Sequence, residues 1–203
     1  MKSPANTKKY YDKNAHLWYE RKTNSFHHQK SFAFFAAQLP KNTTVLDIGC
    51  AAGIHVPLFL GIGRHLKYTG IDISNSFLKV ARARYPQLTF LQADILDETS
   101  LPPKKFGAFW AGAVLMHIPY EDWEHMFTNI EQHMKPAALG FITLPMTHPS
   151  GERAHEDPRH FTILTAKEQR QEIQKRGWSI IKSGTIDGTN VKAVWKWYIV
   201  TLP

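Results

Sequence analysis

Apolar and polar positions alternate along the chain with two different spacings, and the first spacing predicts helices near the N-terminus. Over residues 6–22 the apolar positions recur every three or four residues, which is the period of an amphipathic helix. These positions are Tyr11, Ala15, Trp18 and Tyr19. A second helix is expected over about 28–38, because Pro40 cannot continue it.

Further along, short apolar runs rich in strand-forming residues alternate with helical stretches. The expected strands cover 44–48, 67–71, 88–91, 106–113 and 139–144. The expected helices between them end near Gly61, cover 75–84 with Ser74 as N-cap, and cover 121–134. This alternation predicts βαβ units and therefore a parallel sheet.

The pattern changes after the fifth expected strand. Residues 145–161 are polar and rich in proline and histidine, and a connection of this length can serve as a lid. A helix is expected over 165–176. Segments 178–186 and 194–202 alternate apolar and polar residues, which predicts a β-hairpin at the edge of the sheet.

Length and composition fit one domain inside a cell. The chain has 203 residues, of which 43% are apolar, enough for a single α/β core. Its one cysteine, Cys50, allows no intrachain disulfide, which suits a reducing compartment. Residues 1–11 lack the apolar core of a secretory signal, and no apolar run approaches the ~18 residues of a membrane span. A cytoplasmic location without membrane contact is therefore expected.

Positive charge is concentrated near the N-terminus. The formal net charge is +8, and residues 1–43 hold eight lysines and arginines against two acidic residues. Such a segment can attract an anionic partner, such as RNA or a carboxylate or phosphate substrate. A solvated helix face is the simpler alternative.

Three small residues at alternate positions follow the first expected strand. Gly49, Ala51 and Gly53 come directly after Asp47, which lies near the carboxyl end of that strand. Ligands of open α/β sheets bind at the carboxyl ends of strands, and a turn of small residues lets a ligand lie against the backbone. Dinucleotide-binding proteins use Gly-x-Gly-x-x-Gly here to hold a pyrophosphate, so the Gly-x-Ala-x-Gly spacing indicates a different ligand.

Two further acidic residues end the next two strands. Asp72 closes the second strand, and Asp94 follows the third. Together with Asp47 and its turn, this set resembles the class I methyltransferases that depend on S-adenosylmethionine (SAM). Their first motif is Asp/Glu-x-Gly-x-Gly-x-Gly, and Ala51 stands here in place of the second glycine. The resemblance covers most of the chain.

The resemblance implies a fold and a set of cofactor contacts. The implied fold is α/β: a Rossmann-like, doubly wound, seven-stranded sheet, mostly parallel with an antiparallel C-terminal hairpin, and with helices on both faces. The implied cofactor is SAM, with S-adenosylhomocysteine (SAH) as product. In the family, acids placed like Asp72 and Asp94 bind the ribose hydroxyls and the adenine amino group. The other implied cofactor-binding residues are Tyr11, Tyr19, Arg21, Asp47, Gly49, Cys50, Ala51, Gly53, Ile73, Ile95, Ala111 and Gly112.

Within one domain over 1–203, the resemblance implies three parts. Residues 1–40 form an N-terminal helical lid, and 41–144 form the cofactor-binding core. Residues 145–203 form a loop facing the substrate, a helix and the closing hairpin.

One histidine is a candidate base. Methyl transfer from a sulfonium needs mainly proximity and alignment, and it needs a base only where the nucleophile carries a proton. His117 ends the apolar stretch after the fourth strand, where small-molecule members of the family often have a histidine. A structural histidine is the alternative.

Histidines and acids also gather after the fifth strand, over residues 148–162. Their spacing fits no tight ligand pattern, so no metal is expected. Arg159 and His160 are instead expected to recognise an anionic or polar methyl acceptor.

The expected function is a SAM-dependent methyltransferase acting on oxygen or nitrogen of a small molecule. An RNA methyltransferase of the tRNA type is the alternative that the basic N-terminus favours. A protein that binds SAM or SAH without catalysis is the third.

Overall fold

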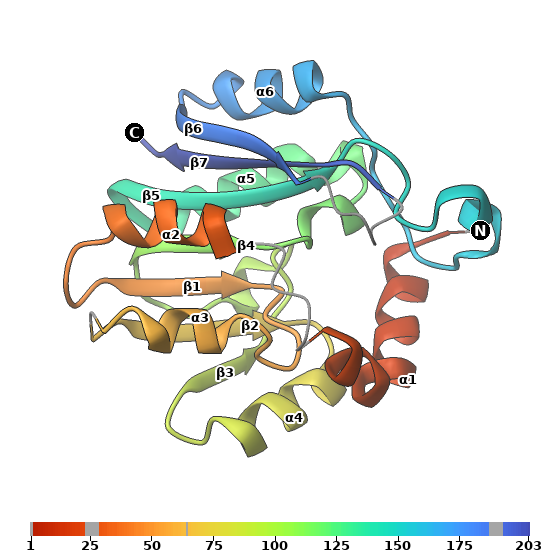
Figure 1. Ribbon diagram of the computed structural model, residues 1–203, viewed down its shortest axis with the longest axis horizontal. Coiled ribbons are helices and arrows are strands. Elements are labelled where there is room, and N and C mark those ends of the chain that lie inside the picture. Colours follow the sequence, from red (N-terminus) through yellow and green to blue (C-terminus); the bar gives the residue numbers. More distant parts are fainter. Residues whose placement is uncertain (1, 23–28, 64, 187–192) are drawn as a thin grey trace.

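Seven strands form a single sheet among the residues that the computed structural model describes, which are 2–22, 29–63, 65–186 and 193–203. The side chains of residues 16, 18–22 and 29 also lie outside this description. The strands are β1 (Thr44–Ile48), β2 (Lys67–Asp72), β3 (Thr89–Gln92), β4 (Phe106–Ala111), β5 (Met134–Pro145), β6 (Ser179–Ile186) and β7 (Trp195–Thr201). Their order across the sheet is β3-β2-β1-β4-β5-β7-β6 (Figure 1).

Strand direction follows the prediction of a mostly parallel sheet. β1 pairs in parallel with β2 and β4, and β4 pairs in parallel with β5. β7 lies antiparallel between β5 and β6, so the C-terminal hairpin closes this end of the sheet. The expected doubly wound, Rossmann-like sheet is confirmed. The strand order reverses between β1 and β4, and such a switch opens a crevice at the carboxyl ends of the two strands.

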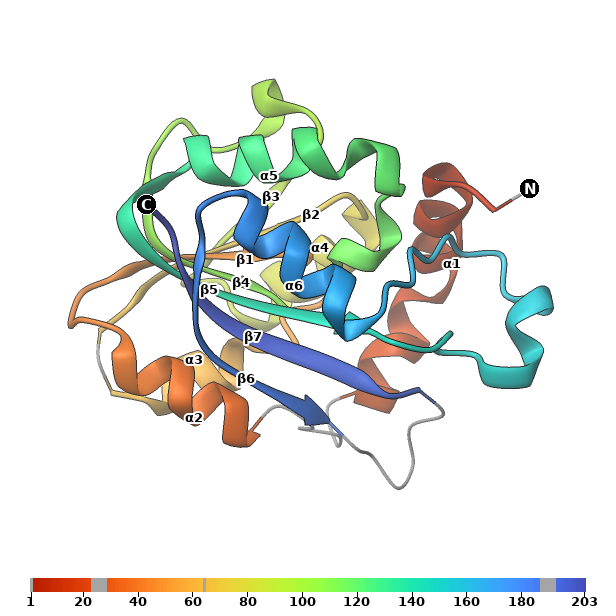
Figure 2. The same ribbon diagram turned by 90° about the horizontal axis from the view of Figure 1, so that it is seen from above.

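Helices cover both faces of the sheet, as expected (Figure 2). These helices are α2 (Gln29–Gln38), α3 (Val56–Gly61), α4 (Asn75–Arg84), α5 (Trp123–Gln132) and α6 (Ala166–Lys175), and a further helix, α1 (Pro4–Lys22), precedes them in the chain. Because side chains alternate along a strand, Leu46 packs in the core on the face of α5 and α6, while Val45 packs with α2, α3 and α4. None of the described helices is long and apolar enough to cross a membrane.

Several predicted element boundaries are wrong: the strand expected over 106–113 ends at Ala111, and the strand expected over 139–144 begins at Met134. The helix expected over 121–134 ends at Gln132, because Met134 already pairs with Phe106 and begins β5. The connection after β5 contains a short 3-10 helix over Gly151–Glu156.

The first helix lies beside the carboxyl ends of the strands (Figure 1). Towards α4, Asp12 Oδ1 accepts a 2.6 Å hydrogen bond from the Ser74 hydroxyl. Towards the loop after β5, Thr7 Oγ1 accepts a 2.8 Å bond from the backbone N–H of His160. The helix is therefore fixed at both sides of the crevice.

Candidate functional site

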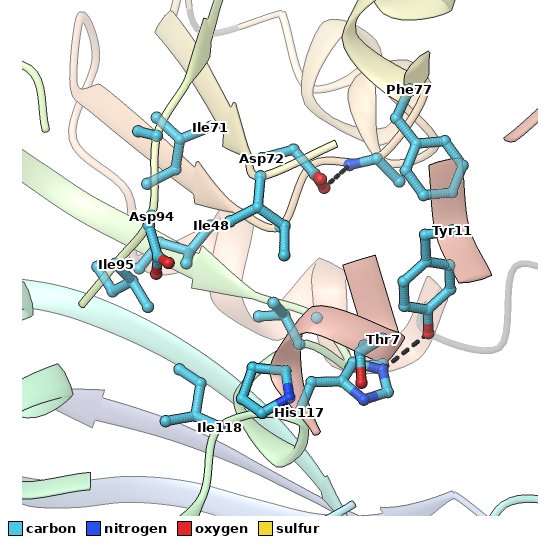
Figure 3. A pocket seen from close by; sticks show the side chains of 18 of the residues that line it. Thr7, Tyr11, Ile48, Ile71, Asp72, Phe77, Asp94, Ile95, His117 and Ile118 are labelled. Atoms are coloured by element: carbon cyan, nitrogen blue, oxygen red, sulfur yellow. Dashed lines mark hydrogen bonds between the residues drawn. The ribbon is translucent and has the colours of Figure 1, made fainter. Parts of the chain in front are cut away.

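A pocket of about 220 Å³ opens at the carboxyl ends of β1, β2 and β4, beside α1 (Figure 3). Nine of the residues predicted from the sequence line it. They are Tyr11, Gly49, Ala51, Asp72, Ile73, Asp94, Ile95, Gly112 and His117. Segments far apart in the chain thus contribute to one cavity, and their role in binding a cofactor stays a prediction.

Four other predicted residues lie close to the pocket without lining it: Asp47, Cys50, Gly53 and Ala111. Cys50 is buried with its sulfur against β2, where a Cβ on Gly70 would come within 2.8 Å of Sγ. Gly53 faces the ring of Tyr85. The side chains of Tyr19 and Arg21, which the family resemblance implies bind the cofactor, lie outside the described residues.

The turn after β1 brings bare backbone to the pocket. Gly49, Ala51 and Gly53 all have positive φ, at +69°, +48° and +75°. A Cβ on Gly49 would come within 2.4 Å of Val114 Cγ2. The backbone N–H groups of Gly49 and Cys50 both donate to the carbonyl of Ile71, which ties the turn to β2. Glycine is therefore needed at the first of these positions, whereas Ala51 occupies a conformation that usually favours glycine.

Asp72 faces the pocket from the end of β2 (Figure 3). Its Oδ2 accepts a 2.9 Å hydrogen bond from the N–H of Ala51, and its Oδ1 accepts a 2.8 Å bond from the N–H of Ser74. Burial raises the pKa of Asp72 to about 6, although these two bonds lower it. A carboxylate has about four acceptor positions, so both oxygens can still accept from a ligand.

Asp94 lies at the rim, next to Ile95 (Figure 3). Its Oδ1 accepts a 3.0 Å bond from the N–H of Leu96, and its own N–H donates to Ser100 Oγ. The carboxylate is exposed, so it is fixed at the pocket mouth without the cost of burial.

Asp47 is the most deeply buried acid of the set, with 0% of its surface exposed. Its Oδ2 accepts a 2.6 Å hydrogen bond from the hydroxyl of Tyr68. Its Oδ1 has no hydrogen-bond partner among the described residues. Asp47 therefore lies behind the pocket wall rather than in it.

His117 and Tyr11 both line the pocket and point toward one another (Figure 3). The Tyr11 hydroxyl lies 2.7 Å from Nε2 of His117, and Nδ1 lies 2.7 Å from the backbone carbonyl of His160. A carbonyl only accepts, so Nδ1 carries the proton and Nε2 accepts from the Tyr11 hydroxyl. Burial lowers the pKa of His117 to about 4, so the ring is neutral at pH 7.

A buried ion pair continues this chain of contacts. Arg159, 8% exposed, donates through Nε and Nη2 to Asp157 and through Nη1 to the Tyr11 hydroxyl, at 3.0 Å. Although burial opposes it, the bonds from Arg159 and Ser150 hold the pKa of Asp157 well below its usual range. Burial raises the pKa of Tyr11 to about 12, against the lowering effect of Arg159. Arg159, expected to face an acceptor, thus already has a carboxylate partner.

Local sequence patterns gave no signal for several of these contacts. Asp157 and Arg159 form a bidentate pair two residues apart, but their link to Tyr11 spans 148 positions. His55, just before α3, also lines the pocket and was not among the predicted residues. In the described part of the chain, no group of three histidines, cysteines or acids is arranged to hold a metal ion.

Part of the basic N-terminal segment is engaged within the molecule. Lys2 donates to the carbonyl of Ala154, and Lys8 pairs with Asp12 at 2.6 Å. An RNA acceptor, which this segment suggested, stays an alternative prediction.

Comparison with known proteins agrees with the geometry. Residues 45–137 match a family described as "Methyltransferase domain". A trans-aconitate 2-methyltransferase of Sinorhizobium medicae (strain WSM419) is 37% identical over 101 residues, which are 49% of this chain and 37% of that protein. Residues 45–137 are therefore similar to known methyltransferase domains.

Solved structures give the same fold over nearly the full chain. The 1,6-didemethyltoxoflavin-N1-methyltransferase of Burkholderia thailandensis, solved with SAH and 1,6-didemethyltoxoflavin, superposes with a TM-score of 0.78 at 14% identity. The match covers 98% of this chain and 88% of that chain. The cyclase SpnF shares the fold with a TM-score of 0.68 at 15% identity, over 86% of this chain and 80% of that one.

The curated relatives are longer than the matched region. Further proteins named trans-aconitate 2-methyltransferase, from Azoarcus sp. (strain BH72) and Rhodopseudomonas palustris (strain BisB18), are 26% and 28% identical. The matches cover 58% and 70% of this chain, but 42% and 57% of those proteins. The chain therefore spans about half the length of the curated relatives it matches.

Proposed function

We propose that this chain binds SAM in the pocket beside α1 and transfers its methyl group to a small molecule. SAM carries that methyl group on a sulfonium, which makes it an activated donor. One observation carries the proposal: the Gly49 turn, Asp72 and Asp94, from the ends of three strands, meet in one cavity. In the proposed binding mode the adenine lies near Asp94 and Ile95, the ribose at Asp72, and the methionine tail beyond Gly49 towards β4.

The residues present fit such a ligand. Gly49 and Gly112 line the pocket, and no larger residue fits at either position, because added Cβ atoms would come within 2.4 Å of Val114 and 2.6 Å of Trp110. Asp72 is buried and has spare acceptor positions, so two ribose hydroxyls would stabilise its ionised form.

A carboxylate is the proposed methyl acceptor. His117 is neutral, its Nε2 accepts from Tyr11, and its low pKa makes it a weak base at pH 7. An acceptor that is already ionised needs no base: its carboxylate oxygen takes the methyl group, the sulfonium C–S bond breaks, and SAH leaves. The relatives named trans-aconitate 2-methyltransferase favour this class of acceptor over amines.

The proposal is tested by incubating the protein with SAM and a panel of small di- and tricarboxylates, including trans-aconitate, beside a panel of amines. The amount of SAH formed is quantified, and the masses of the products are measured by mass spectrometry. A carboxylate that gains one methyl group, sensitive to ester hydrolysis, supports the proposal. Methylated amines with no methylated carboxylates contradict the acceptor class.

A non-methylating role is the second candidate. The chain shares its fold with the cyclase SpnF, and a shared fold does not determine the reaction. A role other than methyl transfer therefore stays a candidate. SAH binding without consumption of SAM across the whole panel would support this second function.

A further inference from the structure

The pocket beside α1 has an aliphatic wall around the start of α3, which the proposed contacts with SAM do not use. Ile54 and Leu58 both line the pocket there. The two residues are four positions apart, and the N–H of Leu58 donates to the carbonyl of His55 at 3.0 Å, so the chain already turns helically between them. Residues with this spacing on a helical stretch lie on the same side of it.

Both side chains are half-buried, so they keep apolar surface that a ligand can cover. Leu58 packs against the core cluster that contains Val56 and Phe59, and it also lines the pocket. Covering such a surface with hydrocarbon is favourable, because apolar area is removed from water. A charged group placed against the same surface would lose its hydration without gaining a partner.

The amino-acid tail of SAM does not match this wall, because the tail ends in an ammonium group and a carboxylate. In the proposed binding mode the tail lies beyond Gly49, and Ile54 and Leu58 follow shortly after Gly49 in the chain. The methyl acceptor has to approach the same end of SAM, because the sulfonium joins the tail to the ribose. The aliphatic wall therefore suits a hydrocarbon part of the acceptor.

The charges around the pocket favour an acceptor with a single carboxylate. Asp72 and Asp94 both line the cavity. One acceptor carboxylate would balance the one positive charge of the sulfonium. Each further carboxylate would bring a negative charge towards Asp72 and Asp94, and charges of like sign repel one another.

We propose that the methyl acceptor is a monocarboxylate whose hydrocarbon chain packs on Ile54 and Leu58, so that these two residues determine acceptor specificity. This inference rests on the proposed function and narrows its acceptor class. In the transfer, one carboxylate oxygen forms a bond to the methyl carbon as the C–S bond breaks. The bonding electron pair stays on sulfur, and no proton is transferred.

The test measures acceptor binding as a function of chain length. The protein is first saturated with sinefungin, a SAM analogue that has an ammonium group in place of the methylsulfonium and transfers no methyl group. Calorimetry then gives its affinities for butanoate, hexanoate and octanoate. Burying one CH₂ group is worth about fourfold in affinity, so we expect hexanoate to bind roughly tenfold more tightly than butanoate, and octanoate more tightly still.

Two ligands with additional carboxylates complete the series. Adipate has the carbon chain of hexanoate and a second carboxylate, and trans-aconitate is named in the description of the curated relatives. We expect both to bind at least about tenfold more weakly than hexanoate, because a second charged group has to leave water at the apolar wall. The yield of methyl ester from SAM is expected to follow the same order as the affinities.

Leu58→Ala is expected to reduce the gain in affinity with chain length. Octanoate should bind about fivefold more weakly or worse than to wild type, whereas butanoate and sinefungin should stay within about twofold. Leu60→Ala is the matched control, since Leu60 lies on the same helix, is 53% exposed and is not among the residues that line the pocket. It is expected to leave every affinity unchanged. Should Leu58→Ala fail to fold, Ile54→Ala replaces it with the same expectation.

Four results would overturn the inference. The first is equal affinity of wild type for butanoate and octanoate, and the second is tighter binding of adipate or trans-aconitate than of hexanoate. The third is an unchanged chain-length effect in Leu58→Ala and Ile54→Ala. The fourth is an equal loss of sinefungin and octanoate affinity, which would assign this wall to the cofactor.

Failure of the proposed function gives a different result. If wild type methylates only di- or tricarboxylates, the proposed function stands and this inference fails. If wild type binds neither SAH nor sinefungin, or methylates none of the carboxylates, the proposed function fails and the inference fails with it.

Discussion

The Tyr11 hydroxyl lies 2.7 Å from Nε2 of His117 and joins the N-terminal helix to the loop after β4. The same hydroxyl accepts from Arg159, which in turn is paired with Asp157. The histidine that sequence reasoning selected as a candidate base is therefore part of the connection that holds α1 over the pocket.

Removing the Tyr11 hydroxyl should destabilise the protein. Tyr11→Phe leaves the buried Nε2 of His117 without its donor and Arg159 Nη1 without its acceptor, so the free energy of unfolding should fall by about 1–3 kcal/mol. Denaturant unfolding measures this. Tyr10→Phe is the matched control, because Arg159 stacks on its ring and the ring is kept. Equal stabilities of the two variants would show that the Tyr11 bonds contribute nothing.

The low pKa of His117 should make stability depend on pH. Between the ordinary value of 6.5 and about 4, the unfolded state binds a proton that the folded state does not, so stability falls as pH falls through this range. Relative to His117→Asn, wild type should lose roughly 3 kcal/mol between these limits. The comparison with the variant is needed because Asp72, whose pKa is raised, has the opposite slope between 3.8 and about 6. If the free energies of unfolding of wild type and His117→Asn change with pH in the same way across this range, His117 is not neutral and buried in the folded protein.

SAH affinity should rise with pH through the titration of Asp72. Ribose hydroxyls donate to the ionised carboxylate, and the free protein protonates it below about pH 6. Calorimetry should show affinity falling by up to about tenfold per pH unit below that value, with proton release on binding. Asp94→Asn, at the exposed rim, should keep this pH dependence, whereas Asp72→Asn should bind weakly and lose it. A pH-independent affinity in wild type would exclude Asp72 as a direct ligand.

Two substitutions in one turn should have opposite effects. Gly49→Ala places a Cβ at positive φ and against Val114, so it should lower both stability, by about 1–2 kcal/mol or more, and SAH affinity. Ala51→Gly relieves a residue at φ +48° and should raise stability by up to about 1 kcal/mol. Thermal unfolding and SAH titration check both. The described turn is wrong if Gly49→Ala is neutral while Ala51→Gly destabilises.

Sequence patterns predicted the fold well because its signals are local. Ser74 caps α4 by accepting from the N–H of Phe77, as expected, and Thr165 caps α6 by accepting from the N–H of Glu168. The start of β5 at Met134 was not predicted, because it depends on pairing with Phe106, a residue on another strand.

The candidate site was predictable only in part, because some of its contacts depend on how distant segments pack together. The carboxyl ends of neighbouring parallel strands meet at one edge, so Asp72 and Asp94 were placed together correctly. Whether a strand-end acid faces the pocket or lies behind it depends on the path of the turn, and Asp47 lies behind. The contact between Arg159 and Tyr11 depends on how α1 docks, which no local spacing encodes.

The central claim is that the pocket beside α1 holds SAM rather than a dinucleotide. Its most direct test is calorimetric titration of the purified chain with SAH and, separately, with NAD. We expect saturable binding of one SAH per chain and no measurable binding of NAD. Tight binding of NAD without binding of SAH would contradict it.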